Sequence, residues 1–161
     1  RINRDVRFSK NKSPYKTNMG ASINKGGRKA ENSAGYYFHL EPGGVFTGGG
    51  IWMPMPDELK KVRQEIDYNF TDFKKIIAAK KFKTVYGELS SNPEYKLSRV
   101  PKGYDPENPA AEFLKLKSYI AMIKISDADL SSKDLVKKTV AAFEALQPLI
   151  EFINEALRAP E

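Results

Sequence analysis

The stretch Tyr36-Tyr-Phe-His-Leu-Glu-Pro-Gly-Gly-Val-Phe-Thr-Gly-Gly-Gly-Ile-Trp-Met53 predicts a β-hairpin. Residues 36–41 alternate, with apolar or aromatic side chains at 36, 38 and 40 on one face and Tyr37, His39 and Glu41 on the other. A Pro-Gly-Gly turn then leads into a return strand over residues 45–53. Glycine weakens a strand, so the run of glycines at 48–50 indicates a bulge or the close approach of another backbone or a ligand.

Further strands are expected on either side of this hairpin. Alternating apolar side chains predict strands over residues 1–9 and 16–23. A short strand is expected over residues 82–88, and another over residues 117–125 rejoins the sheet. Residues 90–108 contain three prolines and a glycine, which predicts an extended connection across the surface.

After the hairpin the apolar residues recur with the period of a helix. Helices are expected from Pro56, over residues 70–80 and over residues 110–116. Ser131 and Asp134 resemble a capping box that opens the longest helix, and Pro148 should kink or split that helix. Its core-facing stripe is expected to be Val136, Val140, Phe143, Leu146, Ile150, Ile153 and Leu157. Early strands and late helices predict a single α+β domain over residues 1–161, with helices on one face of a mainly antiparallel sheet.

The positive charge of the chain is concentrated near its beginning. The formal net charge is +7, and residues 1–30 contain nine basic residues and one acidic residue, so this segment carries +8. Such an asymmetry concentrates anions near one surface, and the effect weakens with salt. It indicates a phosphate-bearing ligand, a nucleic acid or an acidic partner, although a solvated surface that only aids solubility has the same composition.

Composition and motifs argue against several classes of protein. No apolar run reaches the roughly 18–20 residues of a membrane-spanning helix, and the first residues lack the apolar core of a signal peptide, so we expect a cytoplasmic protein without a membrane partner. The chain has no cysteine and one histidine, which excludes disulfides and argues against zinc. The glycines match neither a P-loop nor the dinucleotide fingerprint, and the acidic residues show no metal-ligand spacing. Neither a cofactor nor a metal is therefore expected.

Residues 4–16, which we call the basic arm, are the strongest candidate for a binding site. Their cations are Arg4, Arg7, Lys10, Lys12 and Lys16. In a strand and the turn after it, these side chains can converge on phosphate oxygens, with Tyr15 as a stacking surface or hydroxyl donor and Asp5 and Arg28 in support. Arg4 falls on the apolar face of the expected strand, so its guanidinium needs an acceptor. In the alternative interpretation, Arg4 and Asp5 satisfy buried partners while the lysines extend into solvent.

Two residues of the hairpin are further candidates. Histidine titrates near neutral pH, and Tyr37 and Glu41 share the strand face of His39, so His39 could act as a general acid or base. A lone histidine in a strand can equally be a hydrogen-bonded structural residue. Trp52 lies at the end of a strand, where it either packs at the rim of the core or stacks on a base or ring.

Four segments resemble a known family in the same order along the chain. They are Arg4-Asp-Val-Arg-Phe-Ser-Lys-Asn-Lys-Ser-Pro-Tyr-Lys16, Gly35-Tyr-Tyr-Phe-His-Leu-Glu-Pro-Gly-Gly44, Gly48-Gly-Gly-Ile-Trp-Met-Pro54 and Pro109-Ala-Ala-Glu-Phe-Leu-Lys-Leu-Lys117. The first resembles the hallmark segment of the uncharacterised family known as domain of unknown function 2461. Because members usually carry a further helical segment before this motif, the resemblance implies a chain truncated at its start. It implies no activity.

Three functions follow as hypotheses. The first is a binding module in which the basic arm and neighbouring aromatic side chains hold a phosphorylated or nucleic-acid ligand. The second is an enzyme acting on a phosphate- or carboxylate-bearing small molecule, with Arg4, Arg7 and Lys16 neutralising charge and His39 moving protons. The third is a scaffold for protein interactions that uses the glycine-rich hairpin.

Overall fold

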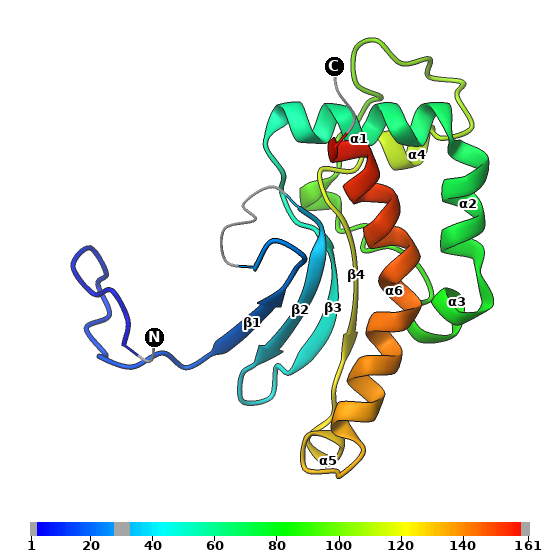
Figure 1. Cartoon of the computed structure of the whole chain (residues 1–161). Coiled ribbons are helices and arrows are strands. Elements are labelled where there is room, and N and C mark those ends of the chain that lie inside the picture. The colour runs from blue at the N-terminus through cyan, green and yellow to red at the C-terminus, as the bar shows by residue number, and fades with distance from the viewer. Residues whose placement is uncertain (1–2, 28–32, 159–161) are drawn as a thin grey trace.

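The computed structural model describes residues 3–27 and 33–158 and contains a four-stranded antiparallel sheet in the order β1-β2-β3-β4 (Figure 1). The strands are β1 (Met19–Ile23), β2 (Gly35–Leu40), β3 (Phe46–Ile51) and β4 (Tyr119–Lys124). The strands expected within residues 16–23, 36–41, 45–53 and 117–125 are therefore confirmed, as is the α+β class. Glycine-rich β3 lies between the hairpin partner β2 and the distant β4.

Helices cover one face of this sheet. They are α1 (Pro56–Tyr68), α2 (Phe70–Ala78), α3 (Lys80–Tyr86), α4 (Ala111–Leu114), α5 (Asp127–Leu130) and α6 (Leu135–Arg158). The longest, α6, runs beside β3 and β4 (Figure 1). Tyr36 of β2 packs on Phe143 of α6 with ring centroids 4.6 Å apart, so the even-numbered side chains of β2 face the helical layer.

The core lies between the sheet and the helices. Phe73 of α2 is fully buried, and its ring contacts Phe113 at 5.2 Å and Phe152 at 5.6 Å between centroids. Of the stripe expected on α6, Leu146, Ile150 and Ile153 are buried, and Phe143 and Leu157 are partly buried. The first turns of α6 are exposed, with Val136 at 71% and Val140 at 47% accessibility, so the prediction that these two valines face the core is wrong.

The strand expected over residues 1–9 is wrong. The described part of that segment makes only an isolated bridge from Asn3 to Tyr15. Phe8 is 96% exposed, so the apolar alternation has no surface to pack against. Arg4 likewise has no buried carboxylate partner there, and its guanidinium approaches the hydroxyl of Ser9 at 3.4 Å.

Two further local predictions fail for clear reasons. The strand expected over residues 82–88 is instead α3, because Phe82 and Tyr86 lie one helical turn apart, where both face the core side. The Tyr86 hydroxyl donates to the carbonyl of Ala142 in α6 at 2.8 Å. The capping box expected from Ser131 and Asp134 is not formed, because the Asp134 N–H donates to the Ser132 hydroxyl instead. Ser126 is the N-cap of the preceding short helix, α5, where its hydroxyl accepts from the Asp129 N–H at 3.1 Å.

The final helix departs from the prediction at its start. It begins at Leu135, after the Asp134 N–H has donated to the Ser132 hydroxyl at 3.1 Å. Pro148 lies inside α6 and does not split it. Among the described residues, no helix has the length and apolar character needed to cross a membrane.

Candidate ligand-binding site

The basic arm lies apart from the helices, beyond the start of β1 (Figure 1). It is closed into a loop at its base, where the Arg4 N–H donates to the Pro14 carbonyl at 2.9 Å. The cations of the arm are held in different ways. Arg7 forms a bidentate pair with Asp5 at 2.9 and 2.6 Å, which raises the pKa of the guanidinium, while Lys12 donates to the Val6 carbonyl at 2.9 Å.

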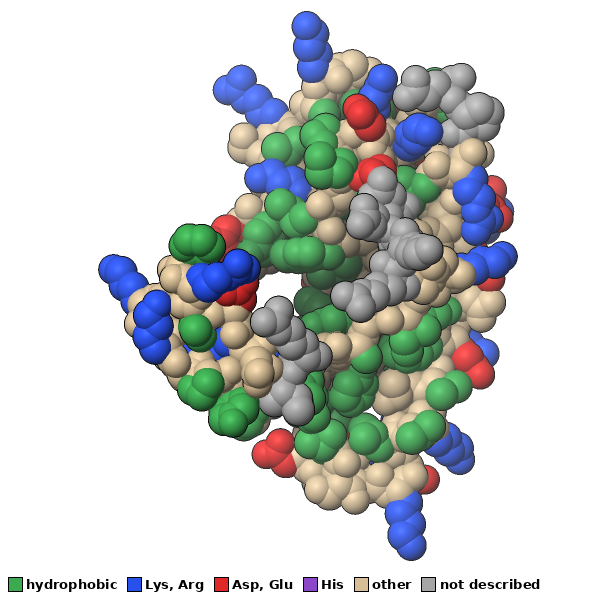
Figure 2. Space-filling view, turned by 60° about the vertical axis from the view of Figure 1, so that its left-hand side comes forward, with side chains coloured by type: hydrophobic (Ala, Val, Ile, Leu, Met, Phe, Trp, Pro, Cys, Tyr) green, Lys and Arg blue, Asp and Glu red, His purple; other side chains and the backbone are tan. Residues whose placement is uncertain are grey.

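The remaining arm residues are directed to solvent. Lys10, Tyr15 and Lys16 are exposed, and within the described residues the two lysines make no hydrogen bond or ion pair. Arg28 lies outside the described residues. Figure 2 shows the arm as a lobe that carries Lys and Arg side chains, with a hollow between it and the hydrophobic side chains of the body.

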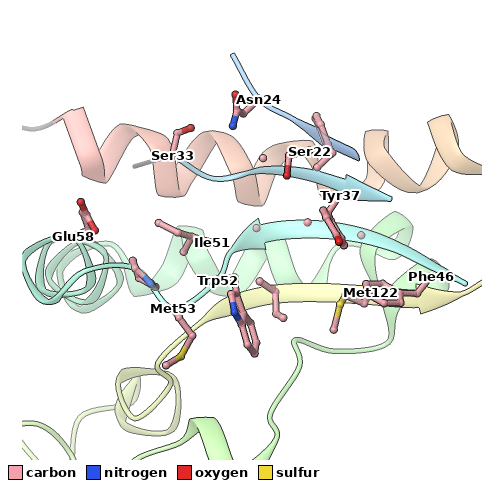
Figure 3. Close-up of a pocket in the computed structure, with 17 residues that line it drawn as sticks. Ser22, Asn24, Ser33, Tyr37, Phe46, Ile51, Trp52, Met53, Glu58 and Met122 are labelled. Carbon is pink, nitrogen blue, oxygen red and sulfur yellow. The ribbon is translucent and has the colours of Figure 1, made fainter. Parts of the chain in front are cut away.

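The face of the sheet opposite α6, which we call the open face, carries a groove of about 670 Å³ (Figure 3). Gly48 and Gly50 lie in its floor. A Cβ atom at Gly48 would lie 2.0 Å from the Ala121 carbonyl oxygen, and one at Gly50 would lie 2.0 Å from that of Tyr119. The close approach of another backbone, inferred from the glycine run, is therefore confirmed. Gly49 faces the other way, because its Cβ would lie 2.9 Å from Leu146 of α6.

Aromatic and thioether side chains line this groove. They include Tyr37, Phe46, Trp52, Met53 and Met122. Trp52 is 55% exposed and packs edge-on against Tyr95 with centroids 4.8 Å apart, so it lies at the rim and not in the core. Met53 adopts a left-handed φ of 43°, and its N–H donates to the Ser118 hydroxyl at 2.9 Å. Backbone strain of this kind clusters at ligand sites.

A hydrogen-bonded row runs along the open face of β2. The Tyr37 hydroxyl lies 3.2 Å from Nδ1 of His39, and Nε2 of His39 lies 3.1 Å from a Glu41 carboxylate oxygen. The imidazole also stacks on Phe46 at 4.6 Å between centroids. The expected sharing of one face by these three side chains is confirmed. Of the three side chains, only Tyr37 is among those that line the groove. Its hydroxyl lies over Gly20 of β1, because a Cβ added there would lie 2.3 Å from the hydroxyl oxygen.

One end of the groove was not anticipated from the sequence. Asn24, Ser33 and Glu58 lie there, just after β1, two residues before β2 and in the first turn of α1, respectively (Figure 3). No sequence motif joins these residues, since the pairing of β1 with β2 and the placement of α1 bring them to one place. Among the described residues, no cluster of three or more His, Asp or Glu side chains could hold a metal ion.

The comparisons with known proteins give one match. The family model described as "Conserved hypothetical protein (DUF2461)" matches residues 1–152. No curated protein and no solved structure matches the chain.

Proposed function

The chain belongs to the DUF2461 family of conserved hypothetical proteins, and we propose that it is a binding module for a phosphate-bearing ligand with a flat ring, a nucleotide or single-stranded nucleic acid. One observation carries the proposal. A sheet whose other face is packed on α6 exposes, on its open face, a groove lined by Tyr37, Phe46 and Trp52. Aromatic side chains on an exposed antiparallel sheet stack on bases in many single-strand-binding modules.

The shape of the groove suits a flat ring. Because Gly48 and Gly50 have no side chains, the floor lies at backbone level while the aromatic side chains form walls. A ring can therefore approach the sheet closely and still contact Trp52, whose indole is more than half exposed. Stacking of a base on an aromatic side chain contributes about 1–3 kcal/mol and tolerates different bases.

The charge of the chain suits the phosphates. The basic arm leads directly into β1, so the arm lies at the β1 edge of the sheet (Figure 1). Lys10 and Lys16 are exposed and make no ion pair within the described residues, so a phosphate would not have to displace an acidic partner from them. Arginines and lysines hold phosphates by charge and by hydrogen bonds.

Fluorescence of Trp52, the single tryptophan of the chain, tests this proposal. Oligo(dT) should quench it saturably, and the logarithm of affinity should fall with the logarithm of salt by about one unit of slope per neutralised phosphate. The triple variant Arg7→Glu, Lys10→Glu, Lys12→Glu should weaken binding by about tenfold or more at low salt. The control variant Lys74→Glu, Lys80→Glu, Lys81→Glu makes the same charge change on α2 and α3 and should not. Equal affinities of both variants would refute the proposed role of the arm.

The hydrogen-bonded row on β2 favours an enzyme as a second candidate. A carboxylate that orients an imidazole, which in turn accepts from a hydroxyl, is an arrangement that activates hydroxyl groups. Here the hydroxyl of Tyr37 would exchange a proton with a phosphate- or carboxylate-bearing substrate in the groove, and His39 would take up that proton. Hydrolysis of p-nitrophenyl phosphate or acetate that is lost in both Tyr37→Phe and His39→Asn would support it. Rates equal to those in buffer would count against it.

A further inference from the structure

Two buried polar atoms at one end of the groove have no partner. They are Oδ1 of Asn24 and Oγ of Ser33, and within the described residues neither makes a hydrogen bond. Both residues line the groove, at the end near α1 (Figure 3). Buried polar groups in native proteins are nearly always satisfied, so a pair left unsatisfied at the end of one groove requires an explanation.

The backbone around these residues is held firmly. Ala34 is buried, and the side-chain amide of Asn154 in α6 both donates to its carbonyl at 3.1 Å and accepts from its N–H at 2.9 Å. Next in the chain, Gly35 packs so closely on β1 that a Cβ there would lie 2.8 Å from Cβ of Asn24. The backbone next to both residues is therefore fixed by packing, although within the described residues Oδ1 of Asn24 and Oγ of Ser33 have no hydrogen-bond partner.

The same end of the groove is rich in hydrogen-bond acceptors. Glu58 lines it, and one of its carboxylate oxygens accepts from the Met55 N–H at 2.6 Å at the start of α1. The Glu58 carboxylate repels a phosphate, and all three side chains can accept a hydrogen bond from an N–H donor. The Asn24 amide also presents a donor beside its acceptor, which pairs with a base edge that carries an amino group beside a ring nitrogen.

We infer that Asn24, Ser33 and Glu58 form a subsite for the amino-bearing edge of a nucleobase. The inference rests on the proposed function and specifies how the ligand is oriented along the groove. The base edge lies at the Asn24 end of the groove, the ring lies over Gly48 and Gly50, and the phosphates extend towards the basic arm. Adenine and cytosine carry the required amino group beside a ring nitrogen, whereas thymine has no amino group.

Affinities of oligo(dC) and oligo(dT), measured by Trp52 fluorescence, test the subsite. Wild type should bind oligo(dC) roughly fivefold more tightly, as one added hydrogen bond gives. The double variant Asn24→Ala, Ser33→Ala should reduce this ratio to about one and leave the affinity for oligo(dT) unchanged. The matched control Ser22→Ala removes a hydroxyl elsewhere in the groove and should keep the preference.

The failure of the subsite and the failure of the proposed function give different results. Salt-dependent binding of both oligonucleotides with equal affinity in wild type would overturn the subsite alone. No saturable binding of either would overturn the proposed function. The single variant Asn24→Ala removes both the donor and the acceptor of that side chain and should lose most of the preference for oligo(dC). If the double variant loses its thermal unfolding transition, this single variant decides, and an unchanged preference in it overturns the subsite.

Discussion

The hydroxyl of Tyr37 lies 3.2 Å from Nδ1 of His39, and the opposite ring nitrogen lies 3.1 Å from the Glu41 carboxylate. Because an ionised carboxylate only accepts, Nε2 must carry the proton of the neutral ring, and Nδ1 then accepts from the tyrosine O–H. The chain has one histidine, so its ring ¹⁵N signals are unambiguous. We expect NMR to show the Nε2–H form with a detectable proton that Glu41→Ala loses. A ring protonated at Nδ1 would contradict this arrangement.

Gly50→Ala should destabilise the protein strongly. Gly50 has a φ of +117°, and an added Cβ would lie 2.0 Å from the Tyr119 carbonyl oxygen on the paired strand, where neither backbone can move freely. We expect a loss of about 3 kcal/mol or more in the free energy of unfolding, measured by urea denaturation.

Gly43→Ala is the matched control for this variant. Gly43 also has a positive φ, +69°, but nothing lies within 4 Å of an added Cβ. Only the backbone strain of about 1–2 kcal/mol should remain. Equal losses in the two variants would show that β3 and β4 do not approach as closely as described.

Alanine variants of two phenylalanines, one in the core and one in the basic arm, should differ in stability. Phe73 is fully buried among other aromatic rings, so Phe73→Ala should cost about 3–5 kcal/mol in the free energy of unfolding. Phe8 is 96% exposed, and Phe8→Ala should change it by no more than about 0.5 kcal/mol. A large effect at Phe8 would mean that the arm packs on the body of the protein.

Glu112 should link stability to acidic pH. Hydrogen bonds from Lys115 and then from Lys96 lower the pKa of its carboxyl from 4.5 to about 2. A lowered pKa stabilises the fold above the unfolded-state value, and this stabilisation is lost as pH falls towards the folded-state value. The stability difference between wild type and Glu112→Gln should therefore be present at neutral pH and disappear between pH 4.5 and about 2. Because the carboxylate is exposed, the difference should also shrink in high salt, and a difference that persists at the lowest pH would contradict the linkage.

The two-residue alternation of side chains in the sequence correctly predicted the strands of the central hairpin. The β2–β3 hairpin followed from its turn and its two-residue period, and the shared face of Tyr37, His39 and Glu41 followed from the same period. A periodic pattern of apolar residues does not show whether another part of the protein covers the apolar face. It therefore predicted a strand around Phe8, where no partner surface exists, and a buried Val136, where α6 extends past the core.

The polar end of the groove could not be predicted from spacing. Asn24 follows β1, Ser33 precedes β2 and Glu58 lies on α1, and all three line one groove. Strand register and helix placement are set by contacts that are distant in sequence. The cations of the basic arm were evident from the sequence. The sequence did not show that Arg7 pairs with Asp5 or that Lys12 donates to the Val6 carbonyl, because these contacts depend on how the arm folds back on itself.

Amide chemical-shift mapping with oligo(dT) at low salt tests the central claim most directly. If the open face binds the ring and the arm binds the phosphates, the largest changes should fall on Gly48, Gly50 and the Trp52 indole, with further changes at Lys10 and Lys12. The amide signals of α2 and α3 should not shift. Changes confined to the helical layer, or no changes at all, would contradict a ligand site on the open face of the sheet.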